Sequence, residues 1–576
     1  MSSGNAILST LGDFRDLLFP WSGSAHTKKY LRDATQESIL GDLLETLKRR
    51  TLERRTLKAG QLAELEKTFY KYAFQDQGNK QRYWNEESFG EHMKQTHPDL
   101  AGSQAVIQLL WRSFHFHAFH PFPDSLTDER IDWEAFQRAF LFQVAQGADL
   151  LGVLEEADMY WQFQYDQNLV HQAKVKRIFR SIAVPERTIA LIEDESNFAV
   201  EETADVVAMM QPFFPPHAPM QEEVFPTAKR LFAGNTTQSR RRVARKHFAT
   251  LLSILIRLRL HASALFGRFE KADPGDELPI ILLDSLGGQD QEYLELDQVS
   301  SILYLLPNLY IRFSQIWKVL FQSHMPADFG TQSEAHNGIS GQIIGAISLF
   351  VPHPITGVNG PMEDGRIAVD SIQLSLNGDS STVTDIAKAF TSDSRPRLML
   401  IAGKNTKNSQ STVMGIYLPS AFSEGVSLRL FFELQPKFRL HRWSSYHKGL
   451  TSMLVRDGSK DVKSLLSRES NANSPGDLES NEPFWIGGPE GEETCIKIDP
   501  ARKLASSVCH STEIQVEYSH FAVLGISGGE PTVLPGLMNT STTWAKGLPG
   551  TFQEGPKTGV NQGNELKARI MGFGPV

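Results

Sequence analysis

Hydrophobic residues recur at helical spacing through much of the first half of the chain. Leu40, Leu43, Leu44 and Leu47 stand three or four positions apart among charged residues, which places them on one helical face. The pattern predicts a helix over 30–65 and further helices over 150–306. Prolines gather in 209–226 and predict a connecting loop, with a polyproline ligand as the alternative. Charged residues mixed with Pro and Gly predict a linker or long turn at 270–279.

Two segments, 65–93 and 109–140, repeat one pattern. Each has an aromatic-rich helix, a polar loop, a short apolar step and a second amphipathic helix, which is similar to an EF-hand helix–loop–helix unit. A calcium loop needs oxygen ligands at alternate early positions and a bidentate carboxylate at its last position. Alignment on the apolar Trp84 and Ile131 gives, as possible ligands, Gln77, Asn79 and Gln81 in the first loop and Asp124, Asp128 and Asp132 in the second, with Ser88 and Ala135 at the last positions. These residues predict a paired-helix scaffold without calcium, and a calcium-sensing adaptor is the alternative.

The pattern changes from helical to alternating after about residue 395. Within 428–434, leucine and phenylalanine side chains occupy one face of a strand, and Arg429 and Glu433 occupy the other. Similar alternation predicts strands at 398–402, 413–418, 428–434, 438–443, 484–486, 494–498, 513–516 and 521–526. Strands this closely spaced, joined by turn residues, predict an antiparallel β-sandwich.

These segments together predict an α+β fold, in which a helical EF-hand-like N-terminal half precedes an antiparallel β-sandwich with flanking helices. A chain of 576 residues exceeds what one core usually organises. The predicted divisions are an EF-hand-like domain at 1–150, a helical region at 151–299, a sandwich domain at 300–528 and an irregular tail at 529–576. Polar segments at 352–395 and 457–481 are predicted surface insertions, and a short helix is predicted at 564–571.

Composition and charge narrow the class of protein. The net charge of −9 argues against a general nucleic-acid binder, because the phosphate backbone attracts basic surfaces. Two cysteines fit a reducing, cytoplasmic compartment. The first residues lack the basic and apolar runs of a secretory signal, and Ser2 stands where myristoylation needs Gly. The apolar stretch 247–260 contains Arg257 and Arg259 and is too short to span a bilayer, so no direct membrane insertion is expected.

Candidate catalytic and metal-binding residues are few. The chain has no Gly-x-Ser-x-Gly elbow, P-loop, HExxH or CxxC motif, so no enzyme and no cofactor is predicted. His115, His117 and His120 lie among aromatic residues, which predicts a packed helix whose histidine tips reach solvent rather than a metal site. Cys509 is interpreted as a small buried hydrophobe, with a redox thiol as the alternative.

One further motif is basic. The run 239–246 (SRRRVARK) is interpreted as a helix start with a solvated basic face, and a nuclear-import signal is the alternative.

The order of motifs over 300–528 resembles the TLDc domain of the oxidation-resistance proteins. A helix ends in a Trp-x-x-Leu-aromatic step, and a Gly-x-Ser step precedes the next helix. A strand carrying Gly, a Phe-Phe-x-Leu-x-Pro segment, a later Trp, a Gly-rich segment and a Ser-x-x-Cys step follow. The matching residues are Trp317, Gly338, Ser340, Gly415, Phe432, Glu433, Pro436, Trp443, Gly487, Gly488, Gly491 and Cys509. The histidine of the family's His-Gly-x-Ser step is replaced by Asn337, and its terminal Trp is absent.

The resemblance implies a non-catalytic protein that binds subunits of the vacuolar proton-pumping ATPase (V-ATPase) and regulates its assembly. The whole chain is similar to the fungal restriction-of-telomere-capping proteins, which implies links to oxidative-stress resistance or telomere capping. A peripheral location at the vacuolar membrane, reached through the partner, follows from the same resemblance. A redox-protective enzyme that uses Cys509 is the alternative from another class.

Overall fold

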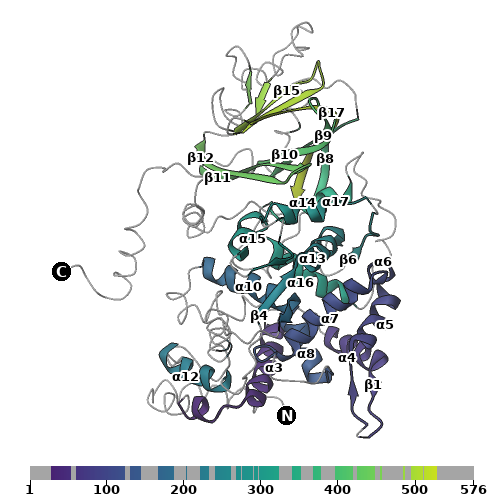
Figure 1. Ribbon diagram of the computed structural model, residues 1–576, viewed down its shortest axis with the longest axis vertical. Coiled ribbons are helices and arrows are strands. Elements are labelled where there is room, and N and C mark those ends of the chain that lie inside the picture. Colours follow the sequence, from purple (N-terminus) through teal and green to yellow (C-terminus); the bar gives the residue numbers. More distant parts are fainter. Residues whose placement is uncertain are drawn as a thin grey trace, which may run out of the picture.

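The computed structural model separates helices and sheet along the long axis of the protein (Figure 1). The structure describes residues 28–53, 60–78, 80–123, 130–144, 167–186, 203, 206, 221–232, 240–260, 267–273, 275–287, 289, 291–295, 298–322, 340–351, 368–377, 389, 396–418, 425–447, 454–456, 484–486, 494–509 and 512–527. Mixed helices and antiparallel strands confirm the α+β class predicted from the sequence.

The first helices begin and end at identifiable signals. They are α3 (Gln36–Glu53), α4 (Gln61–Tyr72), α5 (Glu86–Thr96), α6 (Pro98–Ala101), α7 (Gln104–Phe119) and α8 (Trp133–Val144). The predicted continuous helix over 30–65 is wrong, because the chain leaves the helix at Ala34 and Thr35. Thr35 and Ser38 exchange backbone-to-hydroxyl hydrogen bonds of 2.9 and 3.2 Å, and this reciprocal cap starts α3 afresh.

The two repeated segments are joined at their apolar steps. Trp84 and Ile131 form an isolated antiparallel bridge, with N–H···O distances of 2.8 and 2.9 Å in the two directions. Both side chains are fully buried. The bridge sets α4 and α5 beside α7 and α8, in the lower half of Figure 1.

Short strands interrupt the middle region that was predicted to be helical. Its helices are α10 (Gln167–Ile182), α12 (Gln221–Phe232), α13 (Arg245–Arg257), α14 (Leu278–Asp284), α15 (Val299–Leu305), α16 (Leu309–Leu320) and α17 (Gly341–Ile347). Its strands are β3 (Val184–Glu186), β4 (Arg240–Ala244), β5 (Leu258–Leu260), β6 (Gly267–Phe269) and β7 (Tyr293–Leu294). Residues 221–226 of the predicted Pro-rich loop belong to α12, with Pro226 inside the helix.

The prediction of a helix start over the basic run 239–246 is wrong for most of its residues. Most of it forms β4, which pairs with β3 and β7, and helix α13 begins only at Arg245. Arg242 pairs with Glu295 at 3.2 Å and Arg245 pairs with Asp284 at 2.8 Å. The strand pairing and the Arg242–Glu295 ion pair therefore hold the first part of the run in a sheet, whereas Arg245 begins the helix.

One antiparallel sheet of ten strands forms the other half. Its strands are β8 (Ala368–Asn377), β9 (Arg397–Asn405), β10 (Ser411–Leu418), β11 (Gly425–Gln435), β12 (Arg439–His447), β13 (Leu454–Arg456), β14 (Phe484–Ile486), β15 (Thr494–Asp499), β16 (Leu504–Cys509) and β17 (Thr512–Ser527). The order is β12-β11-β10-β9-β17-β16-β15-β14-β13, and β8 also pairs with β17. The strands form one continuous hydrogen-bonded path, which curls in Figure 1.

Strand β17 joins the two parts of the sheet. Its first half pairs with β16, its second half pairs with β8, and β9 runs along its other edge. Register shifts after Tyr518, Val523 and Gly525 bend this long strand, as bulges do. Strand β8 falls within 352–395, so the prediction of a surface insertion there is wrong: part of that segment is a strand of the sheet. The segments 457–481 and 529–576 lie outside the described residues.

The sheet has apolar side chains on both faces. Leu398, Leu400 and Phe432 belong to the large cluster that continues into the helices, whereas Met399 and Ile401 belong to a second cluster with β15, β16 and β17. Neighbouring residues of a strand point to opposite faces, so β9 supplies both clusters. The sheet is therefore buried on both sides in its centre.

Phe350 connects the helices to the sheet. It follows α17, is 1% exposed, and its ring lies 5.0 Å from that of Phe432 and 5.1 Å from that of Phe438. Helices α14 and α17 lie directly against this side of the sheet (Figure 1). In the described part of the chain, every helix is too short or too polar to cross a membrane.

Truncation of this connection should destabilise the protein strongly. Phe350→Ala removes a buried ring from between two others, and such changes cost about 3–5 kcal/mol because a cavity remains. Ile280→Ala, at a side chain that is 49% exposed on α14, should change the free energy of unfolding by less than about 0.5 kcal/mol. Urea denaturation measures both, and equal losses in the two variants would contradict the proposed connection.

Candidate functional site

The first predicted calcium loop is closed by its own backbone. Strands β1 (Phe74–Gln75) and β2 (Arg82–Tyr83) pair in a hairpin, and the Asp76 N–H donates to the Gln81 carbonyl at 2.9 Å. The Asp76 carboxylate accepts from the Gly78 N–H at 2.8 Å and from Arg130 at 3.2 Å. A guanidinium from the second loop thus lies against a carboxylate of the first loop, just before the predicted ligand positions.

The second loop is described only at its end. Asp132 accepts a hydrogen bond from the Ala135 N–H at 2.8 Å and so caps the start of α8. Asn79, Asp124 and Asp128 lie outside the described residues. Among the residues that are described, no group of three His, Cys, Asp or Glu side chains is placed to hold a metal ion.

The histidines of α7 are buried, contrary to the prediction that their tips reach solvent. His117 and His120 are 4% and 0% exposed, and only His115 is partly exposed. Burial lowers the pKa of His117 to about 3, and its Nδ1–H donates to the Ser113 carbonyl at 2.8 Å. The prediction failed because α5, α8, α10 and α13 all pack on α7, so the helix has little solvated face.

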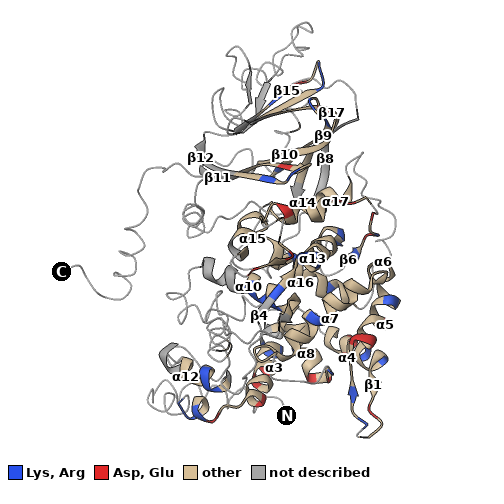
Figure 2. Ribbon diagram, viewed as in Figure 1, with Lys and Arg blue, Asp and Glu red and all other residues tan. Residues whose placement is uncertain are grey.

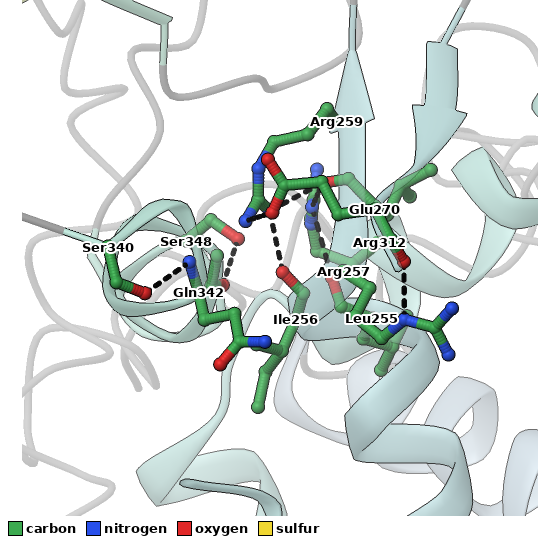
Figure 3. Close-up of polar contacts among 11 residues, drawn as sticks. Leu255, Ile256, Arg257, Arg259, Glu270, Arg312, Ser340, Gln342 and Ser348 are labelled. Carbon is green, nitrogen blue, oxygen red and sulfur yellow. Dashed lines mark hydrogen bonds and ion pairs between the residues drawn. The ribbon is translucent and has the colours of Figure 1, made fainter. Parts of the chain in front are cut away.

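A group of arginines surrounds the end of α13 (Figure 3). Arg259 donates to the Ile256 and Leu258 carbonyls at 2.6 and 3.2 Å and pairs with Glu270 at 2.5 Å. The last carbonyls of a helix have no partner within the helix. Arg259 therefore supplies donors that this buried helix end would otherwise lack.

Two further arginines complete the arrangement, which we call the arginine clamp (Arg257, Arg259 and Arg312 with Glu270). Arg257 donates to the Glu270 carbonyl at 2.6 Å and to the Asp99 carbonyl at 2.7 Å, so it also reaches the N-terminal helices. Arg312, on α16, donates to the Leu258 carbonyl at 2.8 Å. The clamp thus ties together three segments that are far apart in sequence.

The electrostatics of the clamp are set by burial. Desolvation lowers the pKa of Arg312 to about 9, and the neighbouring charge of Arg259 adds to this shift. Arg312 still carries its proton at neutral pH. Positive charge at a helix C-terminus is favourable because the helix dipole is negative there.

Helix α17 lies against the clamp through two glycines. Ser340, a predicted site residue, caps α17 by accepting from the Gln342 N–H at 3.1 Å. A Cβ on Gly341 would meet Arg259 Nη2 at 2.8 Å, and a Cβ on Gly345 would overlap the Ile256 carbonyl oxygen. The spacing of four residues puts both glycines on one helical face. Their missing side chains let α17 contact the clamp directly.

Trp317 and Phe321 connect α16 to the N-terminal helices. Trp317 is fully buried and its ring lies 5.5 Å from Phe114 of α7. The Phe321 ring lies 5.4 Å from Phe136 and stacks on His92 at 5.2 Å. The Trp-x-x-Leu-aromatic step therefore inserts into the aromatic core of the paired helices.

The end of α16 is capped by histidines. The Nε2–H groups of His92 and His97 both reach the Leu320 carbonyl, at 3.0 and 3.3 Å. Because the carbonyl accepts, both rings carry the proton on Nε2. Burial lowers the pKa of His92 to about 3 and that of His97 to about 4, despite these hydrogen bonds. Both rings are neutral at physiological pH.

In the sheet, two predicted residues lie opposite each other. Gly415 of β10 pairs with Phe432 of β11, and a Cβ on Gly415 would meet Phe432 Cζ at 2.6 Å. The glycine leaves space for a ring that reaches Phe350 on the helical side. Pro436 lies in the turn between β11 and β12.

Glu433 lies on the other face of β11 and is only 4% exposed. Its carboxylate accepts a hydrogen bond from Arg439 at 3.1 Å. Burial raises the pKa of Glu433, and the Arg439 charge opposes that shift. The neighbouring Phe431 ring stacks on His441 at 5.9 Å.

The remaining predicted residues are described incompletely. Gly338, Gly487, Gly488 and Gly491 lie outside the described residues. Trp443 is placed by backbone only, in β12 opposite Arg429, and Cys509 ends β16 opposite Thr494. Of the predicted residues, Gly415 and Phe432 thus lie together at the helix–sheet junction, whereas Trp317 lies in the core of the helical half and Ser340 caps α17.

The sequence did not identify the clamp. In the sequence, Arg257 and Arg259 appear only as charges within an apolar stretch, and no pattern points to Arg312, Glu270 or His92. The available signal was the position of arginines within runs of Leu and Ile, since such charges are rarely buried without partners.

Comparisons with known proteins leave the family open. A scan against protein-family models found no match to this chain, and a search of curated proteins found none either.

A methyl group at the clamp should destabilise the fold. Gly345→Ala places a Cβ on the Ile256 carbonyl, and such overpacking costs roughly 1–3 kcal/mol or more. The matched control is Gly41→Ala on α3, where a Cβ meets nothing within 4 Å and the helix should gain about 0.5–1 kcal/mol. Thermal and urea unfolding distinguish the two, and a stabilised Gly345→Ala variant would refute the close packing.

The histidine caps predict a loss of stability in acid. A folded pKa below the unfolded value of about 6.5 means that unfolding takes up protons, so stability is full above pH 6.5 and falls as the pH drops towards 4. His92→Gln keeps an N–H donor for Leu320 and removes the titration. Between pH 6 and 5 its free energy of unfolding should fall by about 1 kcal/mol less than that of the wild type. The free energy of unfolding is measured by urea denaturation at each pH. An equal change with pH in the wild type and in His92→Gln would contradict this assignment.

Proposed function

We propose that this chain is a TLDc-type binding protein, not an enzyme, that engages subunits of the V-ATPase and regulates the assembly of its cytosolic sector with its membrane sector. The observation that carries the proposal is the placement of the motif residues. Trp317 packs α16 against the N-terminal helices, and Ser340 caps α17. Gly415 leaves space for Phe432, whose ring contacts Phe350 between the helices and the sheet. These motif residues are engaged in packing and capping, so the function falls to the surface around them.

The proposal includes the finer features of the fold. The bridge between Trp84 and Ile131 supports an EF-hand-like pair of units, because paired EF-hand loops contact each other through their apolar positions. The curled sheet, with a second apolar cluster inside its bend, supports a sandwich-like TLDc domain. The ion pair between Arg130 and Asp76 favours a scaffold over a calcium sensor, since a fixed cation already neutralises that carboxylate.

Regulation would follow from differential binding. A protein that binds the separated sectors more tightly than the assembled pump shifts the equilibrium towards disassembly, and the opposite preference promotes assembly. Surface loops of the sheet, such as the turn that contains the exposed Lys407, would contact one subunit. The helical half would engage a second one. Location at the vacuolar membrane would then depend on the pump, as would any link to oxidative-stress resistance or telomere capping.

Affinity purification tests the proposal. The tagged full-length chain, expressed in its own cells, should recover V-ATPase subunits by mass spectrometry, and Lys407→Glu should recover less than the control Lys48→Glu on α3. Deletion should change the fraction of cytosolic sector found on membranes. Recovery of no pump subunit, together with unchanged assembly on deletion, would refute the function.

A further inference from the structure

An aromatic–arginine face, formed by Tyr70, Phe74, Arg82, Tyr83 and Arg130, lies on the hairpin of the first loop. The hairpin projects from the helical half, at the end of the protein far from the sheet (Figure 1). Tyr70 and Phe74 are 42% and 39% exposed, and they are two of the four large exposed hydrophobic side chains in the described residues. Exposed aromatic side chains gathered in one place are typical of protein-binding surfaces.

This face is held rigid by contacts to the core. Phe74 and Tyr83 form a cross-strand pair with ring centroids 6.3 Å apart. Tyr70 packs on the buried Phe69 at 5.3 Å and on Trp133 at 6.3 Å. The rings are therefore ordered before any partner arrives, which lowers the entropic cost of binding.

Both arginines are seated on these rings. Arg82 lies 5.5 Å from the Tyr70 ring centroid and donates to the Tyr70 carbonyl at 3.1 Å. Arg130 lies 5.4 Å from the Tyr83 ring centroid and pairs with Asp76. The guanidinium groups are fixed in orientation while both residues remain exposed. Fixed guanidinium groups favour carboxylate partners, which they can bind in a two-point fashion.

The local charge is opposite to that of the whole protein. Residues 70–83 carry Lys71, Lys80 and Arg82 against the single carboxylate Asp76, whereas the chain carries a net charge of −9. The charged positions of the hairpin can be followed in Figure 2. A locally basic surface attracts an acidic partner.

We propose that the aromatic–arginine face binds an acidic peptide segment of a protein partner, with carboxylates on Arg82 and Arg130 and an apolar side chain against Tyr70 and Phe74. Tyrosine and arginine are the residue types that dominate binding energy at protein interfaces. An anionic membrane would be read by flexible lysines as point charges, whereas oriented arginines between rings suit a peptide. The inference rests on the proposed function only in treating the helical half as a binding module.

Fluorescence anisotropy with the full-length chain tests the inference. The acidic probe is a labelled peptide that repeats Glu-Leu-Asp-Phe. The neutral control probe repeats Gln-Leu-Asn-Phe. The acidic probe should bind at least about tenfold more tightly at low salt, and this preference should shrink at 0.5 M salt, where charges are screened. Arg82→Glu and Phe74→Ser should each weaken binding about tenfold or more.

Matched controls separate the surface from general effects. Arg502→Glu, at an exposed arginine in the turn after β15, and Ile280→Ser, at an exposed apolar residue of α14, should bind within about twofold of the wild type. Circular dichroism verifies that each variant is folded, and Phe74→Ser decides the matter if Arg82→Glu does not fold.

Other outcomes overturn the proposal. Equal binding of the two probes, or acidic binding that survives both hairpin variants, would refute it. The proposal is also refuted if the peptide does not bind and the protein instead binds phosphatidylserine vesicles, with that binding lost in Arg82→Glu. It is refuted as well if sedimentation shows a dimer that Phe74→Ser abolishes. If the chain recovers pump subunits but does not bind the acidic peptide, this binding surface is refuted and the proposed function is not.

Discussion

Two helices, α13 and α16, end inside the protein, and the carbonyl groups of their last turns need donors there. Water cannot reach these groups, and an unpaired buried carbonyl costs free energy comparable to a lost hydrogen bond. Arg259 and Arg312 serve the end of α13, and His92 and His97 serve the end of α16. The rest of the architecture is arranged around these two capped ends.

The choice of donor differs between the ends for a physical reason. The arginines stay charged because Glu270 and the negative end of the helix dipole compensate them. Among the described residues, the Leu320 carbonyl contacts histidines and aromatic rings rather than a carboxylate. A neutral imidazole N–H costs less to bury there than a cation. The end of α13 therefore depends on the Arg259–Glu270 ion pair, and the end of α16 depends on the neutral form of His92 and His97.

The capped ends also explain why the motif residues lie where they do. Trp317 and Phe321 place the end of α16 in the aromatic core, and Ser340 begins the helix that packs on the clamp. Phe350, which follows α17, then packs against Phe432 in the sheet. A change at any of these positions would move an element that two others contact, which makes the junction a structural unit rather than a chain of separate contacts.

The sequence predicted what depends on local pattern and missed what depends on distant partners. Alternation identified β11, and the aligned apolar positions Trp84 and Ile131 meet as a bridge, because each pattern lies within a few residues. Strand β8 was missed because its partner, β17, lies about 150 residues away and its own segment is polar. The burial of His117 was missed for a related reason: the helices that cover it come from several distant segments.

The site was predictable only in part. The motif residues act through their size, whereas the capping residues act through hydrogen bonds to distant parts of the backbone. Trp317, Gly415 and Phe432 could be named from the sequence since their roles are steric and use residue types that stand out. Arg312 and His92 act through carbonyls of other segments, and a carbonyl has no signature in a sequence. The same reasoning applies to the hairpin: Phe74 and Arg82 look like ordinary loop residues until the bridge between the loops places Arg130 beside them. A binding surface made this way depends on the fold of both units, because the hairpin supplies its rings and the second unit supplies Arg130.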